Sequence, residues 1–363
     1  MWTIGAEQME AIAVGSAVYG TGGGGDPYLG KLLAQRQLDL HGSVSLIDVL
    51  SLDDEALVIP VAGVGAPLVL TEKLPAVEPL MTALHALEKH LGQRADATLC
   101  VEAGGFNSTI PFSVASRLGL PVIDGDVIGR AFPELQMTTC TMHGIAATPL
   151  AIVDDKSHVV LLQSGNNAFA ERITRGALTE MGGSCAAALY PMTGAQAKKA
   201  VIRGSIRALQ HTGELLMNAR KRGVNPVNAL VEGLGGVLLF QGKVGDVERR
   251  LEGGWQRGAV TIQGLDAFQG SVARLELQNE FLFASVNGTP VAMTPDLICT
   301  LDSESGDPIT SEAMRYGLRV SIMGLPCDVS WRSAKGLELA GPRYFGYDTD
   351  YVPLHECSAL ASV

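Results

Sequence analysis

The sequence predicts an α/β N-terminal domain followed by a β-rich C-terminal domain. At 363 residues the chain has room for roughly two domains of about 150 residues each. Strand-like and helical stretches alternate in the first half, which is typical of a mostly parallel or mixed sheet covered by helices. From residue 237 onward, strand-like runs follow one another, which favours an antiparallel sandwich or barrel. We therefore expect an α/β domain over residues 1–165 and a β-rich (α+β) domain over residues 166–363, with an inserted helical pair.

In the first domain, the spacing of apolar residues separates helices from strands. Met9, Ile12 and Ala13 recur at helical spacing, and Asp26-Pro27 is typical of an N-cap followed by proline in the first helical turn. Residues 149–153 and 158–163 are expected to form a hairpin. The other expected helices and strands are, in order, helices 6–19, 28–37, 76–91 and 109–118, and strands 43–48, 56–62, 97–102 and one that ends at Asp124.

The second half begins with a helix over 169–181 and a strand over 184–190. A long helical segment over 195–219 and a short helix after Asn225-Pro226 form the inserted pair. Asn287-Gly288 is a strong signal for a two-residue hairpin turn. The expected strands of this half are 237–244, 258–262, 271–278, 281–286, 297–302 and 318–323.

Composition excludes several classes of partner. The formal net charge of −11, from 27 basic and 38 acidic residues, argues against binding to a phosphate backbone. The start of the chain lacks the basic and apolar regions of a secretory signal, and the longest apolar run, 56–70, is broken by proline and glycine. Six cysteines without a Cys-x-x-Cys pair indicate neither a disulfide framework nor a zinc ribbon. We expect a cytoplasmic homo-oligomer that binds a small molecule, and neither nucleic acid nor a membrane.

The stretch from Pro121 to Gly144 carries the densest set of reactive side chains. A buried strand there ends in Asp124-Gly125-Asp126, and ligands of α/β proteins bind at the carboxyl ends of strands. Alternatively, the two aspartates only cap the helical turn that follows. Glu102 ends another buried strand, shortly before Asn107. If these strands are parallel, their ends share one edge of the sheet.

A run of four glycines, Gly22 to Gly25, lies between two expected helices and before Asp26. Such a loop leaves backbone N–H groups free to cradle an anionic or carbonyl-bearing ligand at a helix N-terminus. It is neither a Walker A loop nor a Rossmann fingerprint, because no Gly-Lys-Ser/Thr follows and no strand precedes it. We therefore expect no nucleotide cofactor. The alternative is a merely flexible turn.

Two further pairs of residues allow more than one role. Arg130 could form an ion pair with Glu134 on a helix surface, but Pro133 disfavours a helix there, and Arg130 could instead hold a substrate carboxylate bidentately. Cys140 and His143, together with one of the nearby aspartates, offer the mixture of soft and hard ligands that zinc tolerates. The alternative for Cys140 and His143 is a packed strand with one polar face.

Three blocks of the sequence resemble the S-methyl thiohydantoin desulfurase domain family. They are Gly20 to Gly25, DGDVIGRAFPELQM at 124–137, and GLPCDVSWRSAKGLELAGPRYFGYD at 324–348. The resemblance covers nearly the whole chain and implies an α/β N-terminal and a β-rich C-terminal domain. Members of the family include metal-dependent thiohydantoin desulfurases, and related domains are fused to hydantoinase and oxoprolinase polypeptides. The implied reaction is hydrolysis at a five-membered cyclic amide or thioamide, with the thiocarbonyl sulfur leaving as hydrogen sulfide.

Two function classes follow from the residues and the resemblance. The first is a metal-dependent hydrolase or desulfurase of a hydantoin-like or thiohydantoin-like ring, with a divalent transition metal such as zinc. The second is a non-catalytic binding or regulatory partner of a hydantoinase-type or oxoprolinase-type enzyme; a carbohydrate or nucleotide-phosphate binder is a further alternative. The expected residues are Glu102, Asp126 and Arg130 for catalysis, Asp124, Cys140 and His143 for the metal, and Gly22, Gly23, Gly24, Gly25, Asp26, Asn107 and Glu134 for substrate.

Overall fold

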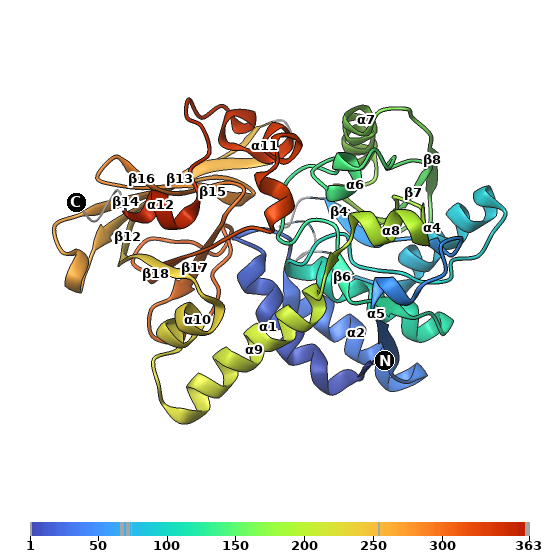
Figure 1. Cartoon of the computed structure of the whole chain (residues 1–363), viewed down its shortest axis with the longest axis horizontal. Coiled ribbons are helices and arrows are strands. Elements are labelled where there is room, and N and C mark those ends of the chain that lie inside the picture. Colours follow the sequence, from blue (N-terminus) through green and yellow to red (C-terminus); the bar gives the residue numbers. More distant parts are fainter. Residues whose placement is uncertain (1, 66–68, 70–72, 74, 253–254, 360–363) are drawn as a thin grey trace. The chain divides into compact units, whose positions relative to one another are not determined.

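The computed structural model describes residues 2–65, 69, 73, 75–252 and 255–359, and these form two compact units (Figure 1). Both units are assembled from segments that are distant in sequence. The first contains the chain up to Ser16, Gly24–Gly129 and Glu134–Gln210, and the second contains Ala17–Gly23, Arg130–Pro133 and the chain from His211 onward. Within the described ranges, no helix is long and apolar enough to cross a membrane.

The first unit contains mixed and antiparallel sheets. A three-stranded sheet has the order β1-β2-β5, in which β1 is antiparallel and β5 parallel to β2. A four-stranded antiparallel sheet has the order β4-β9-β7-β8 and includes the predicted hairpin of β7 and β8. The strands are β1 (Trp2–Ile4), β2 (Val44–Ile47), β3 (Leu57–Val58), β4 (Val61–Gly65), β5 (Val122–Ile123), β6 (Gly125–Asp126), β7 (Leu150–Val153), β8 (Val159–Leu162), β9 (Ser184–Ala188), β10 (Met192–Thr193) and β11 (Ile202–Arg203).

Helices of the first unit cover the sheet through apolar faces. Helix α4 packs on β7 and β9, and α2 packs on α5. Leu84, Val61, Val114 and Ala188 are among the buried side chains of the shared core. Its α-helices are α2 (Pro27–His41), α4 (Val77–Leu91), α5 (Ile110–Leu118), α6 (Thr139–Met142), α7 (Asn167–Glu180) and α8 (Gly194–Ala200). Two further helices, α1 (Met9–Tyr19) and α9 (Ser205–Arg222), begin in the first unit and end in the second.

Parallel pairing places three strand ends at one edge, as the sequence predicted for parallel strands. Leu46 of β2 pairs with Val122 of β5 in parallel. Isolated parallel bridges then join Val122 to Thr98, and Cys100 to Val61. Because these segments run in the same direction, their carboxyl ends, near Gly65, Glu102 and Asp124, lie along a common edge, and Gly63 lies within β4 rather than after it.

The helical segment expected over 195–219 is not continuous. It is interrupted after α8 by the short strand β11, which pairs antiparallel with β6 in the register Ile202 opposite Asp126. Gly204 has φ +83°, a left-handed conformation that a glycine adopts without strain and that ends any helical path through this position. The interruption lets α9 begin beside the Asp124-Gly125-Asp126 segment.

The second unit is built around a seven-stranded antiparallel sheet with the order β16-β15-β14-β13-β12-β18-β17. Strand β17, at one end of this order, also contacts β15 and β16 at the other end, so the sheet is curled. In Figure 1 its strands are coloured from yellow to red-orange. The strands are β12 (Val237–Glu252), β13 (Trp255–Gly264), β14 (Val272–Gln278), β15 (Glu280–Val286), β16 (Thr289–Met293), β17 (Leu297–Asp302) and β18 (Arg319–Leu325), and the helices wholly in this unit are α10 (Pro226–Leu234), α11 (Ala334–Ala340) and α12 (Leu354–Ala359).

Two local signals of the second half are confirmed. Asn225 caps α10 by accepting a hydrogen bond from the Asn228 N–H, with Pro226 in the first turn. Asn287 and Gly288 join β15 to β16 with φ values of +49° and +83°. Both positive values are those of a type I′ turn, whose twist matches that of antiparallel strands.

Arg130 ties together the separate segments of the second unit. Its side chain is fully buried, and its five N–H donors are all used within the unit. Nε donates to Ala131 O at 3.1 Å, Nη1 to Pro295 O at 3.0 Å and Asp296 O at 2.7 Å, and Nη2 to Thr21 Oγ1 at 2.9 Å and Phe281 O at 3.2 Å. Burial lowers the pKa of Arg130 to about 10, against the opposing charge of Glu280, so the guanidinium stays protonated at neutral pH.

We expect Arg130→Met to lower the free energy of unfolding by about 3 kcal/mol or more. The apolar side chain leaves several buried carbonyl oxygens without donors, and each such loss costs about 1–3 kcal/mol. Arg315→Met, at an exposed position of the same unit, is the matched control. Urea unfolding followed by circular dichroism measures both variants, and equal stability of the two would contradict the role of Arg130.

Candidate functional site

Glu102, Asn107 and Gly63 form a hydrogen-bonded group at the common strand edge of the first unit. Asn107 Nδ2 donates to Glu102 Oε1 at 2.7 Å and to Gly63 O at 3.1 Å, and Asn107 Oδ1 accepts from Gly63 N at 2.7 Å. Glu102 and Asn107 are each 8% exposed. The structure therefore joins a predicted catalytic residue to a predicted substrate-binding residue, and the amide fixes the orientation of the carboxylate.

Two glycine turns meet next to this group. Phe106 N donates to Gly24 O at 2.8 Å, and a Cβ atom on Gly105 would lie 2.3 Å from Gly24 O. A Cβ atom on Gly24 would likewise lie 2.9 Å from Gly104 O. Gly24 and Gly105 also have positive φ, so a side chain at either position would be both strained and too close. Gly25 has positive φ as well. The loop is thus a tight backbone packing, not a merely flexible turn.

The predicted glycine run divides between the two units. Gly24 and Gly25 belong to the first unit, whereas Gly22 and Gly23 belong to the second. In the second unit, Ser311 N donates to Gly22 O at 2.8 Å, and a Cβ atom on Gly23 would lie 2.0 Å from Glu280 Oε1. Glycine at position 23 therefore lets the Glu280 carboxylate approach the backbone.

Asp26 has the capping role that the sequence predicted. Its Oδ1 accepts a hydrogen bond from Tyr28 N at 2.8 Å at the start of α2, and Pro27 occupies the first helical turn. The partly exposed carboxylate also belongs to the predicted substrate-binding set, which stays a prediction.

Asp124 and Asp126 both bind the N-terminal end of α9. Asp124 Oδ1 accepts from Arg207 N at 3.2 Å, and its Oδ2 pairs with the Arg207 guanidinium. Asp126 Oδ1 accepts from Ser205 Oγ at 2.6 Å. The two aspartates therefore do cap a helix, but it is α9, some 80 residues further on, and not the turn directly after them.

Asp126 is fully buried and saturated with hydrogen bonds. Its Oδ2 accepts from the backbone N–H groups of Ala103 at 2.8 Å, Ile128 at 3.0 Å and Gly129 at 2.5 Å. Burial raises the pKa of Asp126 to about 6, while the hydrogen bonds from Ser205 and the three amides lower it. A carboxylate with both oxygens engaged by the protein has no free lone pair aimed at a substrate, so the geometry favours a positioning role over the predicted role as base.

The residues predicted to hold a metal do not come together. Cys140 is buried, and burial raises the pKa of its thiol far above the usual value, which disfavours the thiolate that binds metals. His143 is exposed just after α6, and Asp124 is paired with Arg207. Among the described residues, no group of three or more His, Cys, Asp and Glu side chains is placed to hold a metal ion. The donor set of Asp124, Cys140 and His143 therefore does not fit a metal centre.

Arg130 and Glu134 both form hydrogen bonds within the protein. All five N–H donors of Arg130 bind its own unit, so none is left for a substrate carboxylate. Glu134 accepts a hydrogen bond from Gln136 Nε2 in the first unit. Their predicted catalytic and substrate-binding roles gain no support from these contacts.

The sequence analysis did not single out two buried acids of the second unit. Glu280 is 3% exposed, and Asp296 is fully buried. Asp296 accepts hydrogen bonds from Cys327 N at 2.8 Å, Leu354 N at 2.9 Å and Tyr351 Oη at 2.9 Å. The sequence around each acid contains no recognisable motif. Their burial therefore becomes visible only in the fold.

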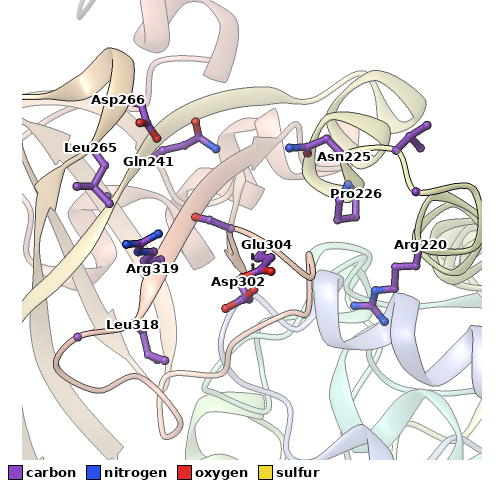
Figure 2. Close-up of a pocket in the computed structure, with 15 residues that line it drawn as sticks. Arg220, Asn225, Pro226, Gln241, Leu265, Asp266, Asp302, Glu304, Leu318 and Arg319 are labelled. Carbon is purple, nitrogen blue, oxygen red and sulfur yellow. Dashed lines mark hydrogen bonds between the residues drawn. The ribbon is translucent and has the colours of Figure 1, made fainter.

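A large cavity of the second unit lies apart from every predicted site residue of that unit. Its volume is about 1020 Å³, and it is lined by α10, β12, β18 and the loops near them. In the view of Figure 2, Asp302 and Glu304 lie between Arg319 and Arg220. Asp302 Oδ1 accepts from the Glu304 and Ser305 amides, and Arg220 pairs with Asp307. The charges on one side of this cavity are thus already compensated within the protein.

A smaller cavity of the first unit adjoins the Glu102 group. It has a volume of about 280 Å³, and Gly63 and Phe106 form part of its wall. Leu80 and Ile110 supply apolar surface, while Lys73 supplies the cationic group of the lining. The backbone of Gly63 therefore connects this cavity to the Asn107 amide and, through it, to Glu102.

A solved structure and two family models resemble the chain, whereas no curated protein matches it. An X-ray crystal structure of a structural-genomics target protein from Chromobacterium violaceum matches with a TM-score of 0.79 and 23% identity, over 98% of this chain and 100% of that chain. At this identity the match shows the fold alone. The model of the S-Me-THD-like N-terminal domain matches residues 7–164, and that of the S-Me-THD-like C-terminal domain matches residues 165–354. The chain therefore belongs to the S-Me-THD-like family, as its resemblance to the S-methyl thiohydantoin desulfurases indicated.

Proposed function

We propose that the chain is a hydrolase that removes sulfur from a thiohydantoin-like cyclic amide and releases it as sulfide. The observation that carries the proposal is the buried Glu102 carboxylate, oriented by Asn107 at the shared strand edge. Membership of the S-Me-THD-like family supports the class of substrate. The smaller cavity, whose wall includes Gly63 and Phe106, adjoins this group and offers apolar surface to a flat ring.

The reaction replaces the thiocarbonyl sulfur by the oxygen of one water molecule. Glu102 accepts a proton from the water as its oxygen bonds to the thiocarbonyl carbon, and the carbon–sulfur π electrons move to sulfur. The tetrahedral intermediate then loses hydrosulfide as the carbon–oxygen double bond forms, and the two protons of the water end on sulfide. Asn107 holds Glu102 in one orientation throughout, since its Nδ2 binds Oε1 while its Oδ1 is bound to Gly63.

The resemblance implied a metal, and a bound metal would supply an activated water. The donor atoms of Asp124, Cys140 and His143 do not converge among the described residues, so these side chains would not hold that metal. Glu102 takes the role of base in this proposal, which the sequence analysis divided between Glu102 and Asp126. The second function class, a non-catalytic partner of a hydantoinase-type enzyme, would bind the ring without releasing sulfide.

We expect Glu102→Gln to reduce sulfide release from a thiohydantoin acid by about 10²–10⁴, the usual contribution of a general base. Glutamine keeps the size and can still accept the Asn107 hydrogen bond, so the ring should bind as before. Glu180→Gln, at an exposed position of the same unit, is the control. Sulfide is measured colorimetrically and binding by calorimetry. Unchanged turnover in Glu102→Gln would exclude Glu102 as base, and ring binding without any wild-type turnover would favour the non-catalytic partner.

Asp126→Asn should keep sulfide release within about tenfold of wild type, because asparagine can accept the three amide hydrogen bonds on its oxygen and meet Ser205 with its nitrogen. A loss as large as that of Glu102→Gln would instead make Asp126 the base. This pair of variants therefore separates the two carboxylates by rate alone.

The same substitution should change how stability depends on pH. The pKa of Asp126 rises from 3.8 to about 6 on folding, so the native protein keeps a proton that the unfolded chain has lost. Its contribution to stability is therefore present below about pH 4 and is lost, by up to about 3 kcal/mol, as the pH rises through 6. Urea unfolding of Asp126→Asn between pH 4 and 7 should show a flatter profile than wild type, and an unchanged profile would contradict the raised pKa.

A further inference from the structure

Three arginines from neighbouring strands line a cavity of about 290 Å³ in the second unit. They are Arg250 on β12, Arg257 on β13 and Arg274 on β14. On β14, Arg274 alternates with Leu275, whose side chain is buried in the core of the curled sheet. The arginines therefore lie on the face of the sheet that is turned away from that core.

The placement of these arginines is costly for the protein alone. Arg250 and Arg257 are directly opposite each other in the register of β12 and β13, and like charges in such a pair destabilise a sheet. Glu252 compensates Arg250 at 3.0 Å, whereas no ion pair among the described residues compensates Arg257. The chain as a whole is acidic, with a net charge of −11, so a gathering of arginines is not a general property of its surface. Such a local cost is typical of a binding site rather than of a structural contact.

Arg257 has unused hydrogen-bonding capacity. Its Nε atom is buried without a hydrogen-bond partner, and none of the ion pairs among the described residues includes this side chain. The neighbouring Arg274 is only loosely paired, with N–O distances of 4.0 Å to Glu248 and 3.8 Å to Glu276. The terminal N–H groups of Arg257 have no hydrogen-bond partner among the described residues, so they can form the two parallel bonds that a carboxylate accepts.

An aromatic wall completes the cavity. Phe345 and Tyr347 line it, and Tyr347 stacks on Phe283 with ring centroids 4.7 Å apart and an interplanar angle of 22°. Burial raises the pKa of Tyr347 and Glu276 adds to this rise, while Arg257 and Arg274 oppose it, so the ring and the two guanidinium groups are close. A flat apolar group can therefore rest against the aromatic side chains while its charge meets the arginines.

We propose that this cavity, which we name the arginine cavity, binds a small planar molecule that carries a single carboxylate. Its volume is at the lower end of the range for ligand pockets and accommodates one ring with its substituents. Its charged lining consists of Arg250, Arg257, Arg274, Glu248 and Glu276, and three positive charges less two negative charges leave +1. This balance suits one carboxylate better than a doubly charged phosphate. The site lies wholly in the second unit and is independent of Glu102.

Benzoate is the probe for the full-length protein, with benzamide as its neutral isostere. We expect saturable benzoate binding by calorimetry, at least about tenfold tighter than benzamide, and an about tenfold or greater loss in Arg257→Gln. Arg315→Gln removes an exposed arginine of the same unit outside the cavity and should bind benzoate as wild type does. Arg257→Lys keeps the positive charge but loses the planar pair of N–H donors. Its affinity for benzoate should lie between those of wild type and Arg257→Gln.

Thermal unfolding gives a second readout that checks folding at the same time. Benzoate should raise the unfolding midpoint of wild type and Arg315→Gln, and should raise that of Arg257→Gln and Arg274→Gln less. Without ligand, Arg257→Gln and Arg274→Gln should unfold as cooperatively as wild type, because each substitution removes one of the arginines that repel one another in the cavity. Any of three results would overturn the proposal. Benzamide could bind as tightly as benzoate, Arg257→Gln and Arg274→Gln could bind benzoate with the affinity of wild type, or phenyl phosphate could bind more tightly than benzoate.

Discussion

The buried carboxylate of Asp126 is the contact on which the first unit depends. One of its oxygens accepts from three backbone amides, and one of these, Ala103 N, directly follows Glu102. The other oxygen binds Ser205 at the start of α9. A single side chain thus fixes the strand end that carries the candidate base, its own turn and the helix that continues into the second unit. Burying an anion is expensive, and here four donors offset that cost.

In the second unit, the buried cation of Arg130 holds the chain together as the buried anion of Asp126 does in the first. Its guanidinium binds backbone oxygens near both ends of the curled sheet, at Phe281 and Asp296, and the hydroxyl of Thr21 in the segment next to the glycine run. Because Arg130 is separated by only three residues from Asp126, one short stretch of sequence supplies the central buried ion of both units. The structural roles of these two ions account for part of the density of polar residues in the 121–144 stretch.

The sequence predicted the elements better than it predicted their partners. Helix caps at Asp26 and Asn225, the hairpin turn at Asn287-Gly288 and the strand end before Asp124 depend on local chemistry, and the structure has them where they were expected. The strand expected over 97–102 is reduced to isolated parallel bridges. The partners of Asp124 and Asp126 lie about 80 residues away, in a helix whose start was hidden because residues 195–219 have the periodicity of one continuous helix. Only the pairing of β11 with β6 places that start.

The three residues predicted to hold a metal lie apart for a related reason. Cys140, His143 and Asp124 are close in sequence, but a helical turn and a tight loop direct their side chains to different environments, one buried, one exposed and one ion-paired. Glu102 and Asn107 show the reverse case, because they are ordinary in sequence and are made specific only by the hydrogen bond between them. A buried polar group that is bonded mainly to backbone from several segments, as in Asp126 and Arg130, holds the chain in place. Glu102, whose carboxylate is oriented by the Asn107 amide beside the smaller cavity, is the better candidate for chemistry, since a general base must be held in one orientation next to its substrate.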